Sequence, residues 1–161
     1  MPVEVRVATL QDVPAMAAMR ARNWETEEFW QVRIGGYLRG SHSPQQALRE
    51  RAAFVAAEEG LVVGFVAGHR TRRFQCDGEL QWIDVEASHR GRGIAGKLMQ
   101  AMGAWFVAQD ALRVCVNVAP ENVAARRLYA RHGAVSLGEH WMVWEDAHTL
   151  CGEPQQSNRP A

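Results

Sequence analysis

The segment from Ser88 to Lys97 carries the strongest chemical signal in the sequence. Gly91 and Gly93 stand directly before a periodic helix expected to begin near Ile94, and glycine allows a tight turn and a close approach of the backbone to a ligand. The first turn of a helix offers unpaired N–H groups and the positive end of the helix dipole. Such a turn favours a bound phosphate or pyrophosphate. Cationic side chains surround it: Arg90, Arg92 and Lys97.

Neither common phosphate loop fits this segment well. A Walker loop requires Ser or Thr after its lysine, and Lys97 is followed by Leu98. The spacing of Gly91, Gly93 and Gly96 matches a dinucleotide fingerprint, but Asp110 ends a helix where that fingerprint needs an acid after a second strand. A solvated turn rich in arginine and glycine is the alternative without function.

Two motifs together favour a more specific interpretation. Arg90-x-x-Gly93-x-Ala95 resembles the acyl-CoA signature Gln/Arg-x-x-Gly-x-Gly/Ala of the GCN5-related N-acetyltransferase (GNAT) superfamily. The run from Asn122 to Gly133 is similar to that family's Asn-x-x-Ala-x-x-x-Tyr-x-x-x-Gly segment. The motifs stand in the expected order, with one helix and one strand between them. The resemblance extends from about Val3 to Glu145, although only these two segments are specific.

The resemblance implies an acyltransferase that moves an acetyl group from acetyl-CoA to a primary amine. It implies direct transfer in a ternary complex, without a covalent enzyme intermediate. We expect no metal, because neither the histidines nor the cysteines have ligand spacing. An acyl-CoA-binding regulatory module without turnover is the alternative. A nucleic-acid-binding module is disfavoured, since 18 basic residues balance 18 acidic ones.

The resemblance also assigns residues to the cofactor. The loop residues Arg90, Gly91, Arg92, Gly93, Ile94 and Ala95 would hold the CoA diphosphate. The strand residues Ile83, Asp84 and Val85 would pair with the pantetheine arm. The Val85 N–H is the predicted donor to the oxyanion, provided that the family's splayed sheet leaves it free of an ordinary strand ladder. Asn122 is predicted both to cap a helix and to bind pantetheine.

Tyr129 is the predicted general acid. A phenol titrates near ~10, so it keeps its proton at pH 7 and can give it to a thiolate whose pKa is near ~8.5. The alternative is a helix tyrosine fixed by packing alone.

Glu79 is the predicted general base, because it looks like the strand glutamate of histone-type members. Strand alternation places it on the same face as Gln81 and Ile83 unless a bulge intervenes. Asp84 and Glu86 are rivals, and a solvent-exposed strand-start glutamate is the alternative without function.

Asn117 stands where members acting on ribosomal-protein N-termini carry a glutamate, and an amide cannot take a proton at pH 7. This departure argues against that subclass.

Other side chains could line an acceptor site. His69 is expected to be exposed or at a strand end, and a lone histidine is more often structural. Four aromatic residues, Trp24, Phe29, Trp30 and Tyr37, lie on the early helices, where one or two could wall the site and the rest would be core.

Hydrophobic periodicity predicts one α/β domain, with a single mixed, mostly antiparallel sheet and helices on both faces. The expected helices span residues 10–23, 25–39, 45–51, 94–109 and 120–133, and the expected strands span 3–7, 52–57, 61–67, 80–85, 114–118, 135–137 and 140–144. The domain is expected to cover residues 1–148, followed by a disordered tail, 149–161.

The composition limits the setting of the protein. Three cysteines without metal-ligand spacing predict a cytoplasmic protein, and no apolar run approaches the ~20 residues of a membrane span. We expect a small-molecule or peptide amine as acceptor, no nucleic acid or membrane partner, and a possible homodimer. The sequence does not identify the acceptor.

Overall fold

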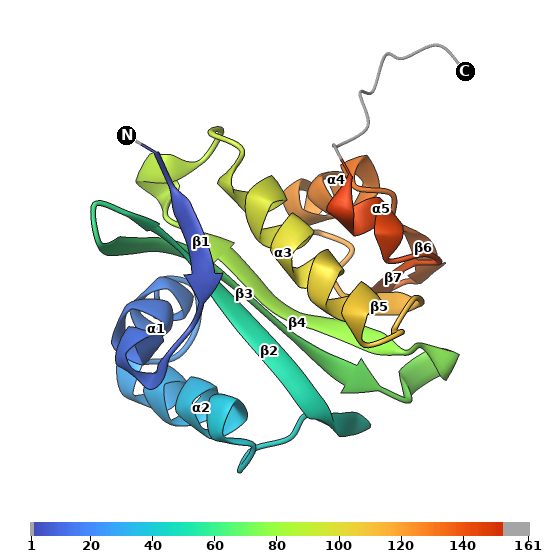
Figure 1. Ribbon diagram of the computed structural model, residues 1–161, viewed down its shortest axis with the longest axis horizontal. Helices are drawn as coiled ribbons and strands as arrows, with labels where there is room; N and C mark the ends of the chain where they lie inside the picture. Colours follow the sequence, from blue (N-terminus) through green and yellow to red (C-terminus); the bar gives the residue numbers. More distant parts are fainter. Residues whose placement is uncertain (1, 153–161) are drawn as a thin grey trace.

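The computed structural model describes residues 2–152. Their strands form one seven-stranded sheet in the order β1-β2-β3-β4-β5-β7-β6 (Figure 1). All neighbouring strands are antiparallel except β4 and β5. The strands are β1 (Glu4–Val7), β2 (Ala47–Glu58), β3 (Leu61–Thr71), β4 (Gly78–Val85), β5 (Val114–Asn117), β6 (Val135–Gly138) and β7 (Trp141–Trp144). The helices are α1 (Val13–Ala21), α2 (Glu27–Arg39), α3 (Ile94–Ala108), α4 (Val123–Arg131) and α5 (His148–Cys151). The predicted fold class is therefore confirmed.

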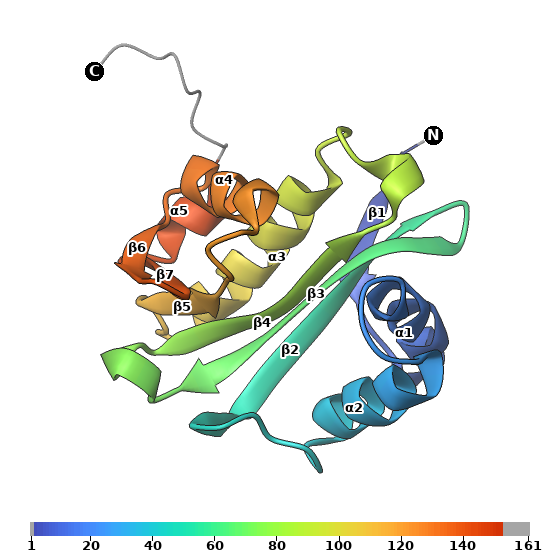
Figure 2. The same ribbon diagram turned by 180° about the vertical axis from the view of Figure 1, so that it is seen from behind.

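Helices cover both faces of the sheet, and each face has its own core. Helices α1 and α2 lie on one side of the long strands and α3 lies on the other, as both views show (Figures 1 and 2). On the α3 side, Leu98, Met102 and Phe106 pack with strand residues such as Leu80. On the other side, the apolar positions of α1 and α2 pack against β2, β3 and Trp82.

The pairing of β4 with β5 is short. It joins only residues 78–80 to residues 114–116, after which β4 continues along β3 while β5 continues along β7. Helix α3 makes the crossover between these two parallel strands. The sheet therefore splits between β4 and β5, and the split opens beyond Leu80.

A β-bulge in β4 changes which side chains share a face. The register with β3 shifts between Leu80 and Trp82, so that Gln81 is the additional residue. Leu80 packs on the α3 side and Trp82 on the α2 side, although simple alternation would place them together. Glu79 consequently shares a face with Trp82 and Asp84, and the predicted grouping of Glu79 with Ile83 is wrong.

Two other boundaries differ from the sequence prediction. Residues 45–51 were predicted as a short helix, but β2 begins at Ala47 and pairs with Thr71 of an extended β3. Pairing with a long neighbouring strand overrides the weak local helix preference. The predicted tail begins too early, because Leu150 of α5 is buried against α3. The part of that tail after Gly152 lies outside the described residues.

The packing of α5 on α3 generates a stability prediction. A Cβ atom added at Gly103 of α3 would lie 2.5 Å from Cβ of Leu150, whereas one added at Gly96 meets His132 only at 3.5 Å. We expect Gly103→Ala to lower the free energy of unfolding by about 1–3 kcal/mol through overpacking. Gly96→Ala, the matched control on the same helix, should raise it by roughly 0.5–1 kcal/mol. Urea unfolding monitored by circular dichroism measures both, and equal effects would contradict tight α3–α5 packing.

Candidate active site

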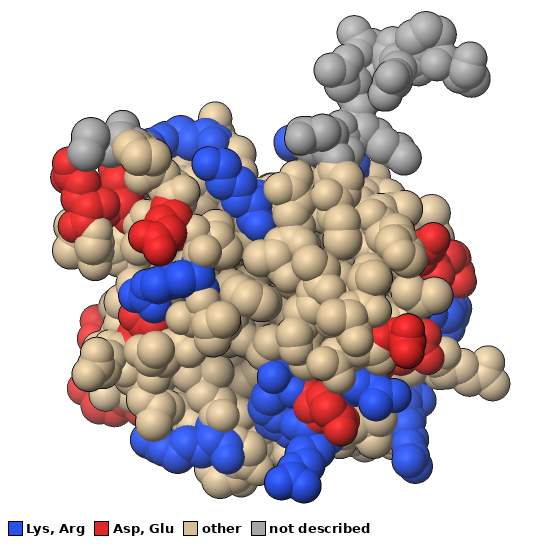
Figure 3. All heavy atoms as spheres, viewed as in Figure 1, with Lys and Arg blue, Asp and Glu red and all other residues tan. Residues whose placement is uncertain are grey.

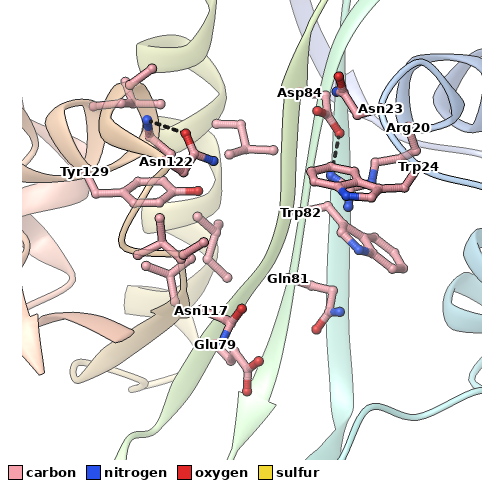
Figure 4. Close-up of a pocket in the computed structure, with 18 of the residues that line it drawn as sticks. Arg20, Asn23, Trp24, Glu79, Gln81, Trp82, Asp84, Asn117, Asn122 and Tyr129 are labelled. Carbon is pink, nitrogen blue, oxygen red and sulfur yellow. Dashed lines mark hydrogen bonds and ion pairs between the residues drawn. The ribbon is translucent and has the colours of Figure 1, made fainter. Parts of the chain in front are cut away.

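A cleft of about 930 Å³ lies where β4 and β5 separate. One side is formed by α4 and the end of β5, and the other by β4 and residues of α1 and the α1–α2 connection (Figure 4). The cleft thus connects the α3–α4 side of the sheet with the α1–α2 side. Both predicted catalytic residues line it, together with Ile83, Asp84, Arg90 and Asn122.

The edge of β4 that faces the split carries backbone groups without a strand partner. Glu86 donates its N–H to the carbonyl of Val63, and the register continues without a shift from there to Trp82. Antiparallel strands alternate hydrogen-bonded and non-hydrogen-bonded pairs. The N–H groups of Ile83 and Val85 therefore point away from β3 and toward the split, where β5 no longer pairs. The N–H of Val85, the predicted oxyanion donor, thus lies on an edge without a strand partner. Ile83 N–H lies on the same edge, and of these two residues only Ile83 lines the cleft.

The glycine loop has the geometry of an anion site. Gly91 and Gly93 have φ angles of +77° and +78°, which L side chains rarely adopt, and no atom lies within 4 Å of a Cβ added at either. Gly93 precedes Ile94, the first residue of α3, and Lys97 N–H is the first donor to bond back, to the carbonyl of Gly93. The N–H groups of residues 94–96 have no carbonyl within the helix to bind, so they remain available for a phosphate.

The cationic side chains of this loop differ in their surroundings. Arg90 lines the cleft and donates through Nε to the carbonyl of Val85. Arg92 instead pairs with Glu58 of β2, which also contacts Nε2 of His89 at 3.3 Å. The structure therefore places Arg90 closer to the cleft interior than Arg92, and Arg92 would have to exchange partners to reach a ligand.

Tyr129 and Asn122 come from opposite ends of α4. Asn122 caps the helix, with Oδ1 accepting the N–H of Ala125 at 3.1 Å. Tyr129 is 6% exposed and its ring packs edge-on against Trp144. Its hydroxyl points into the split toward β4 (Figure 4). Burial raises the pKa of Tyr129, with a further contribution from the nearby carboxylate of Asp84, so the phenol is protonated at neutral pH.

Asp84 and Arg20 form the polar part of the α1–α2 end of the cleft. Nη1 of Arg20 donates to Oδ2 of Asp84 at 3.1 Å (Figure 4). The guanidinium also lies over the rings of Trp24 and Trp30, 5.1 and 4.7 Å from their centroids. Burial raises the pKa of the Asp84 carboxyl despite the opposing effect of Arg20. A carboxylate so placed can accept a proton closer to neutral pH than an ordinary aspartate.

The other two predicted carboxylates lie in different environments. Glu79 lines the lower end of the cleft in Figure 4, is 5% exposed, and accepts from Nε of Arg73 through Oε1 at 3.1 Å. It is therefore not the exposed strand-start glutamate that the alternative reading required. Glu86 pairs with Arg22 and is not among the cleft-lining residues.

Two features of this site differ from or go beyond what the sequence predicts. His69 was expected to be exposed or at a strand end, but it is fully buried opposite Glu79. Arg20 was not considered, because nothing local connects a residue of α1 with one of β4. The only sequence signal for His69 was its place within a long β-rich run, since β3 extends through it to Thr71.

The charged surface, the groups of potential metal ligands and the helix lengths are the features that bear on other common kinds of site. On the face shown in Figure 3, acidic and basic side chains are interspersed mainly around the periphery, and the centre of the face is largely uncharged. Among residues 2–152 no group of three or more His, Cys, Asp or Glu side chains is placed to hold a metal ion. In the same range, every helix is too short or too polar to cross a bilayer.

Comparison with known proteins identifies the family. The model of the acetyltransferase (GNAT) family matches residues 16–134, which is most of the chain. This chain belongs to the GNAT family. It is therefore an acyltransferase, and the loop and the split described above occupy the matched region. No curated protein sequence matches this acetyltransferase significantly.

Solved structures share the fold of this acetyltransferase. The PaiA N-acetyltransferase of Thermoplasma acidophilum, crystallised with coenzyme A, is 12% identical with a TM-score of 0.68, covering 91% of this chain and 99% of that one. Ard1 of Thermoplasma volcanium is 19% identical with a TM-score of 0.71, covering 89% and 95%. A ribosomal-protein-alanine N-acetyltransferase of Brucella melitensis is 19% identical with a TM-score of 0.64, covering 87% and 96%.

The loop geometry predicts how variants bind acetyl-CoA. We expect Gly93→Val to weaken binding at least tenfold, because valine cannot keep φ near +78° without strain of roughly 1–2 kcal/mol. Arg92→Ala should weaken binding only modestly, since Arg92 already pairs with Glu58. Gly40→Val is the matched control, because Gly40 has φ +79° and equally open space at the far end of α2. Calorimetric titration with acetyl-CoA measures the affinity of each variant. An unchanged affinity in Gly93→Val would show that the loop does not bind acetyl-CoA.

Proposed function

We propose that this acetyltransferase moves the acetyl group of acetyl-CoA to a primary amine by direct transfer within a ternary complex. The observation that carries the proposal is the cleft through the split sheet. It brings the free N–H edge of β4, the Tyr129 hydroxyl and the α1–α2 end together. Acetyl-CoA would enter from the glycine loop, and the amine from the side of Trp24 and Asp84.

The N–H groups on the free edge of β4 stabilise the negative charge that develops on the thioester oxygen. The loop residues 90–95 hold the diphosphate, and the pantetheine arm follows Ile83–Val85 toward Asn122. The thioester carbonyl then lies against the N–H of Val85 or Ile83. A fixed backbone donor aimed at a developing oxyanion lowers the barrier without any reorganisation at the moment of reaction.

Tyr129 supplies the proton for the leaving group. Attack by the amine forms the C–N bond and breaks the C–S bond, which leaves a thiolate near α4. The buried hydroxyl of Tyr129 keeps its proton until that charge appears, and then donates to the sulfur. The phenolate left on Tyr129 takes a proton back from water before the next turnover. The same burial desolvates the thiolate and raises the pKa of the thiol, so the pKa values of the proton donor and of the proton acceptor rise together.

A carboxylate must take the proton of the amine, and two line the cleft. We propose that Glu79 does so through a water, because Figure 4 places its carboxylate below Tyr129 and directed away from it. Asp84 is the second candidate, favoured by its raised pKa and by its position beside the α1–α2 end. Matched amide variants of the two separate these assignments.

The setting of the enzyme is also a proposal. Cys76, Cys115 and Cys151 are free thiols, which supports location in a reducing cytoplasm. The acceptor is a small-molecule or peptide amine. A thiol-release screen across amino acids, polyamines, aminoglycosides and peptide N-termini would identify its class. Absence of acetyl-CoA-dependent thiol release with every amine would favour the alternative, a binding module without turnover.

Tyr129→Phe tests the general acid. The ring should still pack on Trp144, so acetyl-CoA affinity should be unchanged. Turnover with a working amine should fall by about 100- to 10,000-fold, because only the proton donor is lost. Steady-state thiol release and calorimetric titration measure the two quantities. A loss of turnover below about threefold would show that water or the substrate protonates the thiolate.

Glu79→Gln and Asp84→Asn test the general base. Each keeps the side-chain shape and removes proton acceptance. We expect Glu79→Gln to lower turnover near neutral pH and to recover as rising pH supplies neutral amine. If Asp84 is the base instead, Asp84→Asn alone removes the acidic limb of the pH–rate profile. That limb would lie above the usual range of an aspartate, because a base is active only above its pKa and the pKa of Asp84 is raised.

A further inference from the structure

Behind Glu79 lies a row of buried polar groups that the proposed reaction does not yet use. His69 of β3 is paired across the sheet with Glu79, and it is fully buried. Its Nδ1 lies 2.9 Å from the hydroxyl of Tyr37, which comes from α2 and is also fully buried. Its Nε2 lies 3.7 Å from Oε1 of Glu79 and has no hydrogen-bond partner within residues 2–152. The row therefore runs from α2 through β3 to the carboxylate in the cleft.

The partners of the imidazole decide where its proton lies. A neutral histidine has one donor and one acceptor nitrogen. Nε2 faces a carboxylate, which can only accept, so Nε2 must carry the proton and Nδ1 must accept. The Tyr37 hydroxyl is then the donor to Nδ1. Burial raises the pKa of Tyr37, so that its hydroxyl keeps the proton it has to donate.

Glu79 is held through one oxygen. Nε of Arg73 donates to Oε1, the same oxygen that Nε2 of His69 faces. Arg73 is fixed in turn, because Nη2 donates to the carbonyl of Gln45 and the guanidinium lies over the ring of Trp141. With both donors directed at Oε1, the other oxygen, Oε2, is the one left for the cleft.

We propose that His69, held by Tyr37, is the positioning residue that orients Glu79 for proton acceptance. On binding of the amine, Nε2–H of His69 closes the present 3.7 Å gap to a hydrogen bond with Oε1. Contacts of this kind are often long before substrate binds and tighten in the complex. The acceptor's proton then passes through a water to Oε2. His69 and Tyr37 neither gain nor lose a proton, and Glu79 later returns its proton to water.

This inference rests on the proposed role of Glu79, and paired variants separate the two. Tyr37→Phe removes one buried hydroxyl and keeps the ring. His69→Phe removes both nitrogens, and His69→Gln keeps a side-chain N–H donor. We expect turnover to fall roughly 10- to 100-fold in His69→Phe, the range seen when a supporting hydrogen-bond partner is lost. The loss should be smaller in Tyr37→Phe and partly restored in His69→Gln, with acetyl-CoA affinity unchanged in all three.

The decisive measurement is the turnover of double variants, in which the same substitutions are introduced into the Glu79→Gln variant. A residue that acts through Glu79 should cause little further loss of turnover once the carboxylate is gone. Equal losses in both backgrounds, or full turnover in His69→Phe, would overturn the positioning role. Full turnover in Glu79→Gln would instead show that Glu79 is not the general base. Independently of activity, ¹⁵N NMR of the imidazole should show Nε2 protonated and Nδ1 not, and the opposite tautomer in the free protein would contradict the proposal.

Discussion

Strands β4 and β5 share backbone hydrogen bonds over only three residue pairs, and the candidate site lies where that pairing stops. Beyond Leu80 the N–H groups of Ile83 and Val85 have no strand neighbour on the β5 side. A buried backbone group without a partner costs on the order of 1–3 kcal/mol, so these groups must face a solvated cleft or a ligand. The split thus combines an open cleft with backbone donors that have no strand partner.

The two helical layers support the strands beside this split from opposite faces of the sheet. Helix α3 anchors β4 through Leu98, Met102 and Phe106, while α1 and α2 pack on the other face through a separate core. Helix α4 follows β5 rather than β4, so Tyr129 belongs to the far side of the cleft. The α3-side core nevertheless contains residues from both sides of the split, because Leu80 of β4, Val116 of β5 and Tyr129 of α4 belong to the same cluster.

The charged groups around the cleft are arranged in pairs. Asp84 is paired with Arg20, Glu79 with Arg73, Glu86 with Arg22 and Glu58 with Arg92. A carboxylate removed from water needs such a partner or it becomes protonated. The pairing also fixes which oxygen of each carboxylate is available. For Glu79 that selection involves His69 and Tyr37 as well, which connects a residue in the cleft to the core under α2.

The sequence by itself determined the fold class, the glycine loop before α3 and the motif segment that contains Asn122 and Tyr129. These features depend on local chemistry: glycines before a helix, a capping side chain, and hydrophobic periodicity that fits one kind of element. Only the tertiary structure decided the rest. The bulge at Gln81 changed the face of Glu79, pairing with β3 turned residues 47–51 into a strand, and α5 extended the folded region past residue 148. The Arg20–Asp84 contact joins a helix to a strand, and the His69–Glu79 contact joins two strands. Both contacts depend on how these elements are placed relative to one another, and no local sequence pattern encodes that placement.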